Sequence, residues 1–136
     1  EPGKRPFHTI IPAFVTKAGK PYFSYGVMGG SMQPQGHVQI LMNMVDFGMD
    51  PQEAGDAPRI RHEGSSTPEG QAADGVGNLM LEAGFSPAVV RDLIMMRHKV
   101  GSDLFFGGYQ GILWHEEEGY YEGATESRFD GASVGY

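Results

Sequence analysis

Two apolar segments near the start of the chain are rich in β-branched and aromatic residues: IIPAFVT over residues 10–16 and PYFSYGVM over residues 21–28. Such composition favours β-strands. The residues that separate the two segments include Gly19, which can take a positive φ and therefore suits a tight turn. The pattern predicts a β-hairpin.

After the glycine pair Gly29-Gly30, the apolar spacing changes from that of a strand to that of a helix. Apolar side chains recur at i, i+3, i+4, i+7 and i+11, which places them on one helical face. They are Val38, Leu41, Met42, Val45 and Met49. We predict a helix over residues 34–47 that packs on a sheet through the first four of these side chains and stops at Gly48.

A second, shorter helix is predicted over residues 51–57. Asp50 can cap it, Pro51 suits the first helical position, and Glu53 lies three residues after the cap. A brief strand is predicted directly afterwards, over residues 59–62.

Residues 63–78 (EGSSTPEGQAADGVGN) are rich in Ser, Gly and Pro, and we predict a loop there that is the most mobile part of the chain. A short strand is expected over residues 79–82. The Ser86-Pro87 pair then begins a helix that is predicted to run to His98. One side of this helix carries Val90, Leu93, Ile94 and Arg97.

The last predicted elements are strands over residues 110–115 and 120–124, which can pair across a short turn. Strand pairs therefore stand beside helices along the chain, and this order favours a layered α+β fold over a parallel βαβ sheet. A length of 136 residues suits one domain, residues 1–136.

Composition excludes several classes of function. Hydrophobic residues make up 40% and charged residues 20%, which is typical of a globular chain. The net charge of −7 argues against a broad nucleic-acid-binding face, and no apolar run is long enough for a membrane span. There is no cysteine, and the five histidines show no metal-ligand spacing, so we expect neither a metal nor a cofactor. The compartment stays open between the cytoplasm and the periplasm or exterior.

Candidate chemistry concentrates at Gly29-Gly30, where a strand meets a helix N-terminus. Backbone N–H groups at such a corner can form an oxyanion hole, although a tight turn that needs glycine is the simpler interpretation. His8 could serve as a base and Thr9 as a hydrogen-bond donor, or the two could form a polar strand edge. From the residues alone, the interpretation stops at an α+β domain.

Four segments extend the interpretation: GKRPFHTIIPAF, GVMGGSMQPQGHVQ, FGMDPQEAGDAPR and GATESRFDGASVGY. Together, and in this order, they resemble the C-terminal part of the small subunit of the γ-glutamyltranspeptidase family. The resemblance covers the chain from about Gly3 to Tyr136. It implies the αββα sandwich of the N-terminal-nucleophile hydrolases.

The resemblance also implies a mechanism. A precursor cleaves itself and frees an N-terminal Thr, whose hydroxyl attacks a γ-glutamyl amide to form an acyl-enzyme. Water or an amino acceptor then takes the acyl group. In this sequence the oxyanion-hole glycines match Gly29 and Gly30. Substrate-binding positions match His8 and Thr9, where typical members carry a Ser-Ser pair, so His8 departs from the family pattern.

The family's nucleophilic Thr lies upstream of this segment, and the chain opens with Glu1-Pro2 rather than an initiator Met. We therefore expect a piece of a longer precursor, inactive alone, whose partners are the rest of that precursor. An exported chain whose leader has been removed is the other option. Sheet edges and apolar faces left without partners would favour self-association.

Two alternatives to an enzyme segment remain. A non-catalytic relative could keep the fold as a binding or scaffold module, and His8 is its main support. An unrelated small-ligand-binding α+β domain would lack the layers of the family fold.

Overall fold

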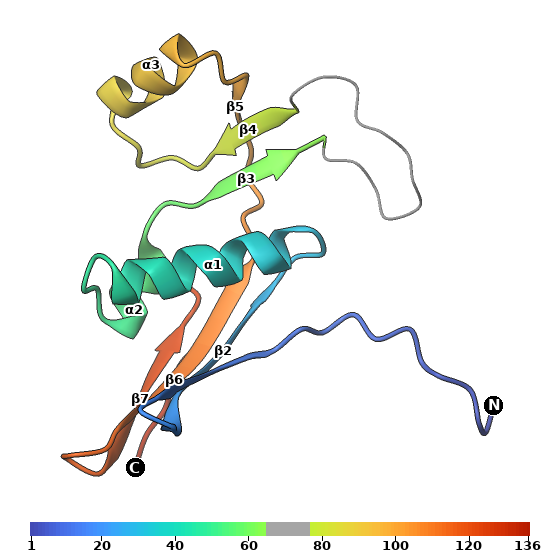
Figure 1. The fold of residues 1–136 in the computed structure, drawn as a ribbon, viewed down its shortest axis with the longest axis vertical. Helices are drawn as coiled ribbons and strands as arrows, with labels where there is room; N and C mark the ends of the chain where they lie inside the picture. Colours follow the sequence, from blue (N-terminus) through green and yellow to red (C-terminus); the bar gives the residue numbers. More distant parts are fainter. Residues whose placement is uncertain (65–76) are drawn as a thin grey trace.

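The computed structural model describes residues 1–64 and 77–136. In these two ranges it contains a four-stranded sheet with strand order β1-β2-β6-β7 and a three-stranded sheet with order β3-β4-β5 (Figure 1). The strands are β1 (Ala13–Lys17), β2 (Lys20–Met28), β3 (Ile60–Glu63), β4 (Asn78–Leu81), β5 (Val100–Ser102), β6 (Gly108–His115) and β7 (Tyr120–Thr125). The helices are α1 (Met32–Val45), α2 (Pro51–Asp56) and α3 (Pro87–Met95).

Helices α1 and α2 cover one face of the larger sheet, and the core lies between them. Alternate residues of a strand point to opposite faces, so every second side chain of β2 and β6 enters this core. The buried core residues are Phe23, Tyr25, Val27, Ile40, Ala54, Tyr109, Leu113 and Ala124. The α+β fold class is confirmed, and a sheet with helices on one face is one half of the predicted αββα sandwich.

The opposite face of the larger sheet, called the open face below, carries no helix of the described residues, although Phe129 and Ser133 approach β6 and β7 on it. It carries Phe14 from β1, Met28 from β2 and Ile112 from β6, whose exposed fractions are 64%, 58% and 54%. Sheets that fold with two layers bury such residues against a second layer. These three apolar side chains are therefore more than half exposed to solvent on one face of the sheet.

Most predicted elements are present, with bounds that differ by a few residues. The pairs β1–β2 and β6–β7 are antiparallel, as expected. Strand β5 was not predicted, and it pairs with β4 in parallel, so the smaller sheet is mixed rather than purely antiparallel. Three residues are too few to carry a recognisable alternation of polar and apolar positions.

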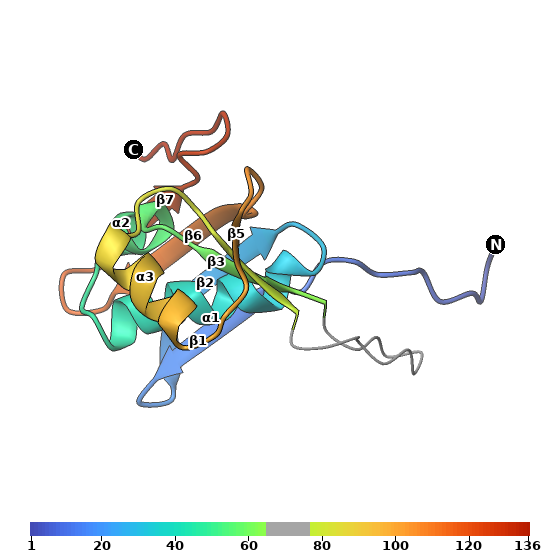
Figure 2. The same cartoon turned by 90° about the horizontal axis from the view of Figure 1, so that it is seen from above.

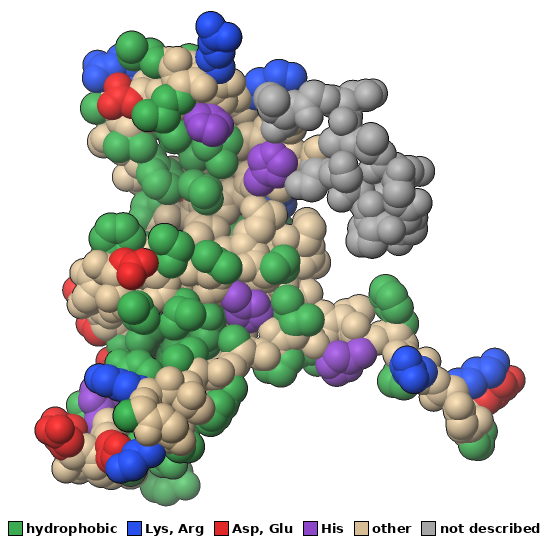
Figure 3. Space-filling view, viewed as in Figure 1, with side chains coloured by type: hydrophobic (Ala, Val, Ile, Leu, Met, Phe, Trp, Pro, Cys, Tyr) green, Lys and Arg blue, Asp and Glu red, His purple; other side chains and the backbone are tan. Residues whose placement is uncertain are grey.

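The predicted packing face of α1 is wrong for three of its four residues. Only Leu41 packs against the core, while 57% of Val38, 45% of Met42 and 68% of Val45 are exposed. The buried positions of α1 are Met32, Gly36 and Ile40. Gly36 decides this orientation, because a Cβ there would lie 2.6 Å from Val27 Cγ1, so the helix approaches β2 through its glycine. In the space-filling view, apolar side chains gather over the outward face of α1 (Figure 3).

Helix α3 also differs from its prediction. It ends at Met95, and Arg97 lies beyond it at a φ of +70°. Val90 and Leu93 are half-buried, but Ile94 is 55% exposed. Of the loop predicted over residues 63–78, residues 65–76 lie outside the described part, while the terminal residues of the prediction belong to β3 and β4.

The capping box predicted for α2 is confirmed. The Asp50 side chain accepts a hydrogen bond from the Glu53 N–H at 2.7 Å, and the Glu53 side chain accepts one from the Asp50 N–H at 3.1 Å. Among the helices of the described ranges, none combines the length and the apolar character needed to cross a bilayer.

Two glutamine side chains of α1 join the smaller sheet to the helix. Gln39 donates to the Ile60 carbonyl at 2.9 Å and accepts from its N–H at 2.7 Å. Gln35 donates to the His62 carbonyl at 3.2 Å and accepts from its N–H at 2.7 Å. The two amides therefore occupy the hydrogen-bonding positions of a neighbouring strand along β3, which satisfies an otherwise unpaired edge.

The first twelve residues form an arm that leaves the body of the molecule, as both ribbon views show (Figure 2). Phe7 in this arm is 96% exposed.

Candidate active site

The Gly29-Gly30 corner joins the end of β2 to the start of α1. Gly29 has a φ of +129° and Gly30 a φ of +58°, which only glycine adopts without strain. Their carbonyls accept from the N–H groups of Met32 and Gln33 at 3.0 and 3.1 Å and so begin the helix. Among the backbone hydrogen bonds outside helices and strands in the described ranges, none is donated by the N–H of Gly29 or Gly30.

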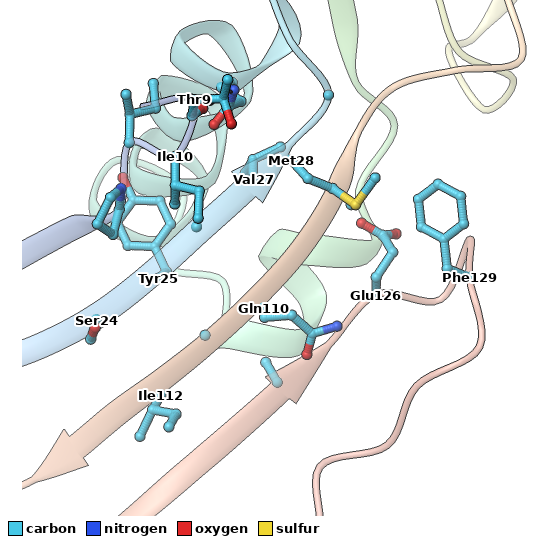
Figure 4. Close-up of a pocket in the computed structure, with 18 of the residues that line it drawn as sticks. Thr9, Ile10, Ser24, Tyr25, Val27, Met28, Gln110, Ile112, Glu126 and Phe129 are labelled. Carbon is cyan, nitrogen blue, oxygen red and sulfur yellow. Dashed lines mark hydrogen bonds between the residues drawn. The ribbon is translucent and has the colours of Figure 1, made fainter. Parts of the chain in front are cut away.

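These two glycines line a cleft of about 890 Å³ on the open face of the larger sheet. Figure 4 shows Thr9 and Ile10 on the side of the N-terminal arm, and Met28, Glu126 and Phe129 on the other. Thr9 thus lines the cleft, and its carbonyl accepts from Gln33 Nε2 at 3.0 Å, which ties the arm to α1. Its contact with substrate stays a prediction. His8 is exposed and is not among the residues that line the cleft, so its role stays a prediction.

Gly29 has no room for a side chain. A Cβ there would lie 3.1 Å from the Gly107 Cα and 3.2 Å from both the Met32 Cβ and the Phe105 ring. At Gly30, in contrast, a Cβ would meet nothing within 4 Å. Gly29 therefore packs tightly against the segment before β6, whereas Gly30 has free space beside it.

A buried ion network lies beneath the corner. Arg59, with 1% of its surface exposed, donates to the carbonyls of Phe106 and Gly107 at 2.9 and 3.2 Å. Arg59 also pairs with Glu126 at 2.9 Å between Nη2 and Oε2. The charges of this network therefore hold the chain immediately before β6.

Arg128 completes the network, because it pairs with both Glu126 and Glu82. Burial alone would raise the pKa of Glu126, but the hydrogen bonds from Arg128 and the charge of Arg59 outweigh it and hold this pKa below its ordinary value. Burial lowers the pKa of Arg59. Glu126 is accordingly an anion at neutral pH, as a buried carboxylate with two guanidinium partners should be.

Sequence reasoning did not single out Arg59, Glu126 or Arg128. Burial of the first two could not be read from a sequence pattern, since charged residues are rarely buried unless paired.

The chemistry that this site can perform is limited. Backbone N–H groups near the N-terminus of α1 can stabilise negative charge on an oxygen. None of the described residues that line the cleft is a histidine, lysine or arginine, and of its two carboxylates, Glu126 and Asp130, the first already accepts hydrogen bonds from Arg59, Arg128 and Tyr109. The described residues also contain no group of three or more His, Cys, Asp or Glu side chains that could hold a metal ion. The backbone N–H groups of the corner can therefore polarise a carbonyl that enters the cleft.

Comparison with known proteins identifies a family and relatives that this chain resembles. The family model described as "Gamma-glutamyltranspeptidase" matches residues 1–136. The chain is 36% identical over 143 residues to the glutathione hydrolase-like YwrD proenzyme of Bacillus subtilis and 34% identical over 138 residues to the oxamate amidohydrolase proenzyme of Klebsiella pneumoniae. Both alignments cover 99% of this chain but 25% of the relative.

Solved structures agree. A cephalosporin acylase from Bacillus halodurans superposes with a TM-score of 0.77 at 39% identity, covering 100% of this chain and 24% of that protein. A mutant γ-glutamyltranspeptidase of Helicobacter pylori gives a TM-score of 0.77 at 26% identity, covering 95% of this chain and 66% of that chain.

The fold is thus that of the N-terminal-nucleophile hydrolases. Within that class, the chain belongs to the γ-glutamyltranspeptidase family. It spans about a quarter of the length of the curated relatives it matches. The resemblance that the four sequence segments carry is therefore confirmed.

Proposed function

We propose that this chain is the C-terminal segment of an N-terminal-nucleophile amidohydrolase or acyltransferase. It supplies the oxyanion hole through the N–H groups of Gly29 and Gly30, and His8 and Thr9 contact the substrate. The observation that carries the proposal is the Gly29-Gly30 corner, which lies at the cleft with both residues at positive φ. The nucleophilic Thr belongs to a part of the precursor outside this chain.

The proposed reaction divides an amide cleavage into two steps. The Thr hydroxyl oxygen adds to the carbonyl carbon of a γ-glutamyl or related acyl amide, and its own amine accepts the hydroxyl proton. The carbonyl oxygen becomes an oxyanion that the two glycine N–H groups stabilise. The C–N bond then breaks, and the leaving amine takes the proton. Water or an amino acceptor finally attacks the acyl-enzyme, which returns the Thr hydroxyl.

The open face of the larger sheet supports the proposal that the rest of the precursor is the partner. Its apolar residues, such as Phe14 and Ile112, are suited to contact a second layer. We infer that a chain produced without this partner associates with itself through the same face.

A non-catalytic relative is the second candidate. Its support is His8, which takes a position where typical family members carry a hydroxyl, and which does not line the cleft. In that case the corner would serve only as a turn.

The test compares the longer precursor with the 136-residue chain on a γ-glutamyl anilide and on a panel of acyl amides. We expect turnover by the precursor after self-cleavage and none by the chain alone. Replacing the Thr at the cleavage junction with Ala should abolish both cleavage and turnover. A precursor that neither cleaves itself nor turns over any amide would favour the scaffold candidate, and turnover by the chain alone would contradict the upstream nucleophile.

A further inference from the structure

Residues 103–107, which connect β5 to β6, form a loop that abuts the glycine corner. The Phe105 ring and the Gly107 backbone supply two of the three atoms nearest to a Cβ built at Gly29. A Cβ at Gly107 would in turn lie 2.4 Å from the Met28 carbonyl oxygen, so the loop and the end of β2 meet backbone to backbone. Any movement of this loop would therefore alter the space available to the corner.

Two arginines hold the loop by its carbonyls. Arg59 takes the carbonyls of Phe106 and Gly107, whereas Arg61 donates from Nη1 to the Phe105 carbonyl at 3.2 Å. Arg61 lies in β3 and Arg59 directly precedes that strand, so both side chains reach the same loop from neighbouring positions. The carbonyls of three successive residues, 105–107, thus accept hydrogen bonds from these two arginines.

Arg61 also forms an ion pair with Asp103 at the start of the loop. The Asp103 carboxylate accepts from the Leu104 N–H at 2.6 Å, and this bond and the Arg61 charge hold the pKa of Asp103 below its ordinary value. The Arg61 side chain is 13% exposed and that of Asp103 is 32% exposed. The Arg61 side chain is therefore more exposed than that of Arg59, which is buried in an ion pair with Glu126.

We propose that Arg61 is a positioning residue for the oxyanion hole: through Phe105 and Asp103 it holds the loop of residues 103–107 against Gly29. This inference rests on the proposed function of Gly29-Gly30. An oxyanion hole stabilises charge only if its donors are already in place when the charge develops. Small misplacements in an active site can cost about 100-fold in rate. Arg61 would then influence kcat without touching substrate.

The experiment uses the longer precursor that carries this chain, after self-cleavage. Arg61→Gln removes the charge, and Arg61→Lys restores the charge without the fork of donors that reaches both Phe105 and Asp103. The matched control is Arg91→Gln on α3, because Arg91 is exposed and its ion pair, with the adjacent Asp92, lies outside the loop. Kinetics on the best amide substrate are combined with amide hydrogen exchange at residues 104–107.

We expect Arg61→Gln to lower kcat by about 10- to 100-fold with KM little changed, and to speed exchange at residues 104–107. Arg61→Lys should recover part of kcat, and the control should match the wild type. A wild-type kcat in Arg61→Gln, a change in KM alone, or unaltered exchange would overturn the inference. If the wild-type precursor is inactive on every amide, the proposed function fails, and the exchange measurement still decides whether Arg61 holds the loop.

Discussion

Glu126 offers the most direct test of the buried network beneath the corner. Its Oε2 accepts from Arg59 Nη2 at 2.9 Å and from the Tyr109 N–H at 2.6 Å. Its Oε1 accepts from Arg128 Nη1 at 2.7 Å and from the Arg128 N–H at 3.2 Å. Only 3% of the residue is exposed. Every oxygen of this carboxylate thus serves at least two donors.

Glu126→Gln keeps the shape of the side chain but changes one acceptor into a donor. Whichever way the amide turns, its NH₂ group faces two donors, and Arg59 loses its buried counter-charge. Breaking a buried ion pair by removing one partner typically costs about 3–5 kcal/mol of unfolding free energy. We expect Glu126→Gln to lower the unfolding free energy by this amount at pH 7, measured by urea denaturation. The control is the same substitution at an exposed position, Glu116→Gln.

The pH dependence of this loss has a definite sign. Because the folded pKa of Glu126 is held below 4.5, its stabilisation is complete above that value and disappears as pH falls through the folded pKa. The gap between wild type and Glu126→Gln should therefore narrow in acid. A gap under about 1 kcal/mol at pH 7, well below the cost of a broken buried pair, would refute the reasoning, as would a gap that does not narrow.

Further predictions concern α1. Ile40→Ala should lower the unfolding free energy by about 2–5 kcal/mol, whereas Val45→Asp, at a 68% exposed position, should change it by less than about 0.5 kcal/mol. Denaturation midpoints measure both changes. A larger loss of unfolding free energy for Val45→Asp would indicate that Val45 is buried, as the sequence pattern predicts. The Val27 N–H donates to His37 Nε2 at 3.2 Å, which requires a neutral ring, and burial lowers the pKa of His37. Its stabilisation is thus present above pH 6.5 and lost as pH falls through the folded pKa, and an NMR titration with a pKa at or above 6.5 would contradict this.

Much of the fold could be predicted because its signals are local. The hairpins follow from pairs of β-rich segments separated by short turns, and the Asp50 capping box follows from a spacing of three residues. The packing face of α1 could not be predicted, because three side chains of its apolar stripe, Val38, Met42 and Val45, are exposed. The glycine at position 36, not an apolar side chain, marks the contact with β2.

The candidate site divides in the same way. The Gly29-Gly30 corner follows from a strand, two glycines and a helix in succession, and its positive φ values agree with that pattern. The link between Arg61 and residues 103–107 joins segments about forty residues apart, and only the three-dimensional arrangement places them together. No local pattern encodes such a long-range contact.

In the proposed mechanism, the N–H of Gly30 stabilises an oxyanion. The most direct test of this role is the kcat of the self-cleaved precursor carrying either Gly30→Ala or Gly30→Pro. Both substitutions strain the Gly30 backbone, which has a φ of +58°, and a Cβ at this position meets nothing within 4 Å. Only proline removes the N–H. With folding checked by circular dichroism, we expect Gly30→Pro to lower kcat about 10²–10³-fold and Gly30→Ala to lose far less. A folded Gly30→Pro enzyme with the same kcat as Gly30→Ala would show that Gly30 is only a turn residue.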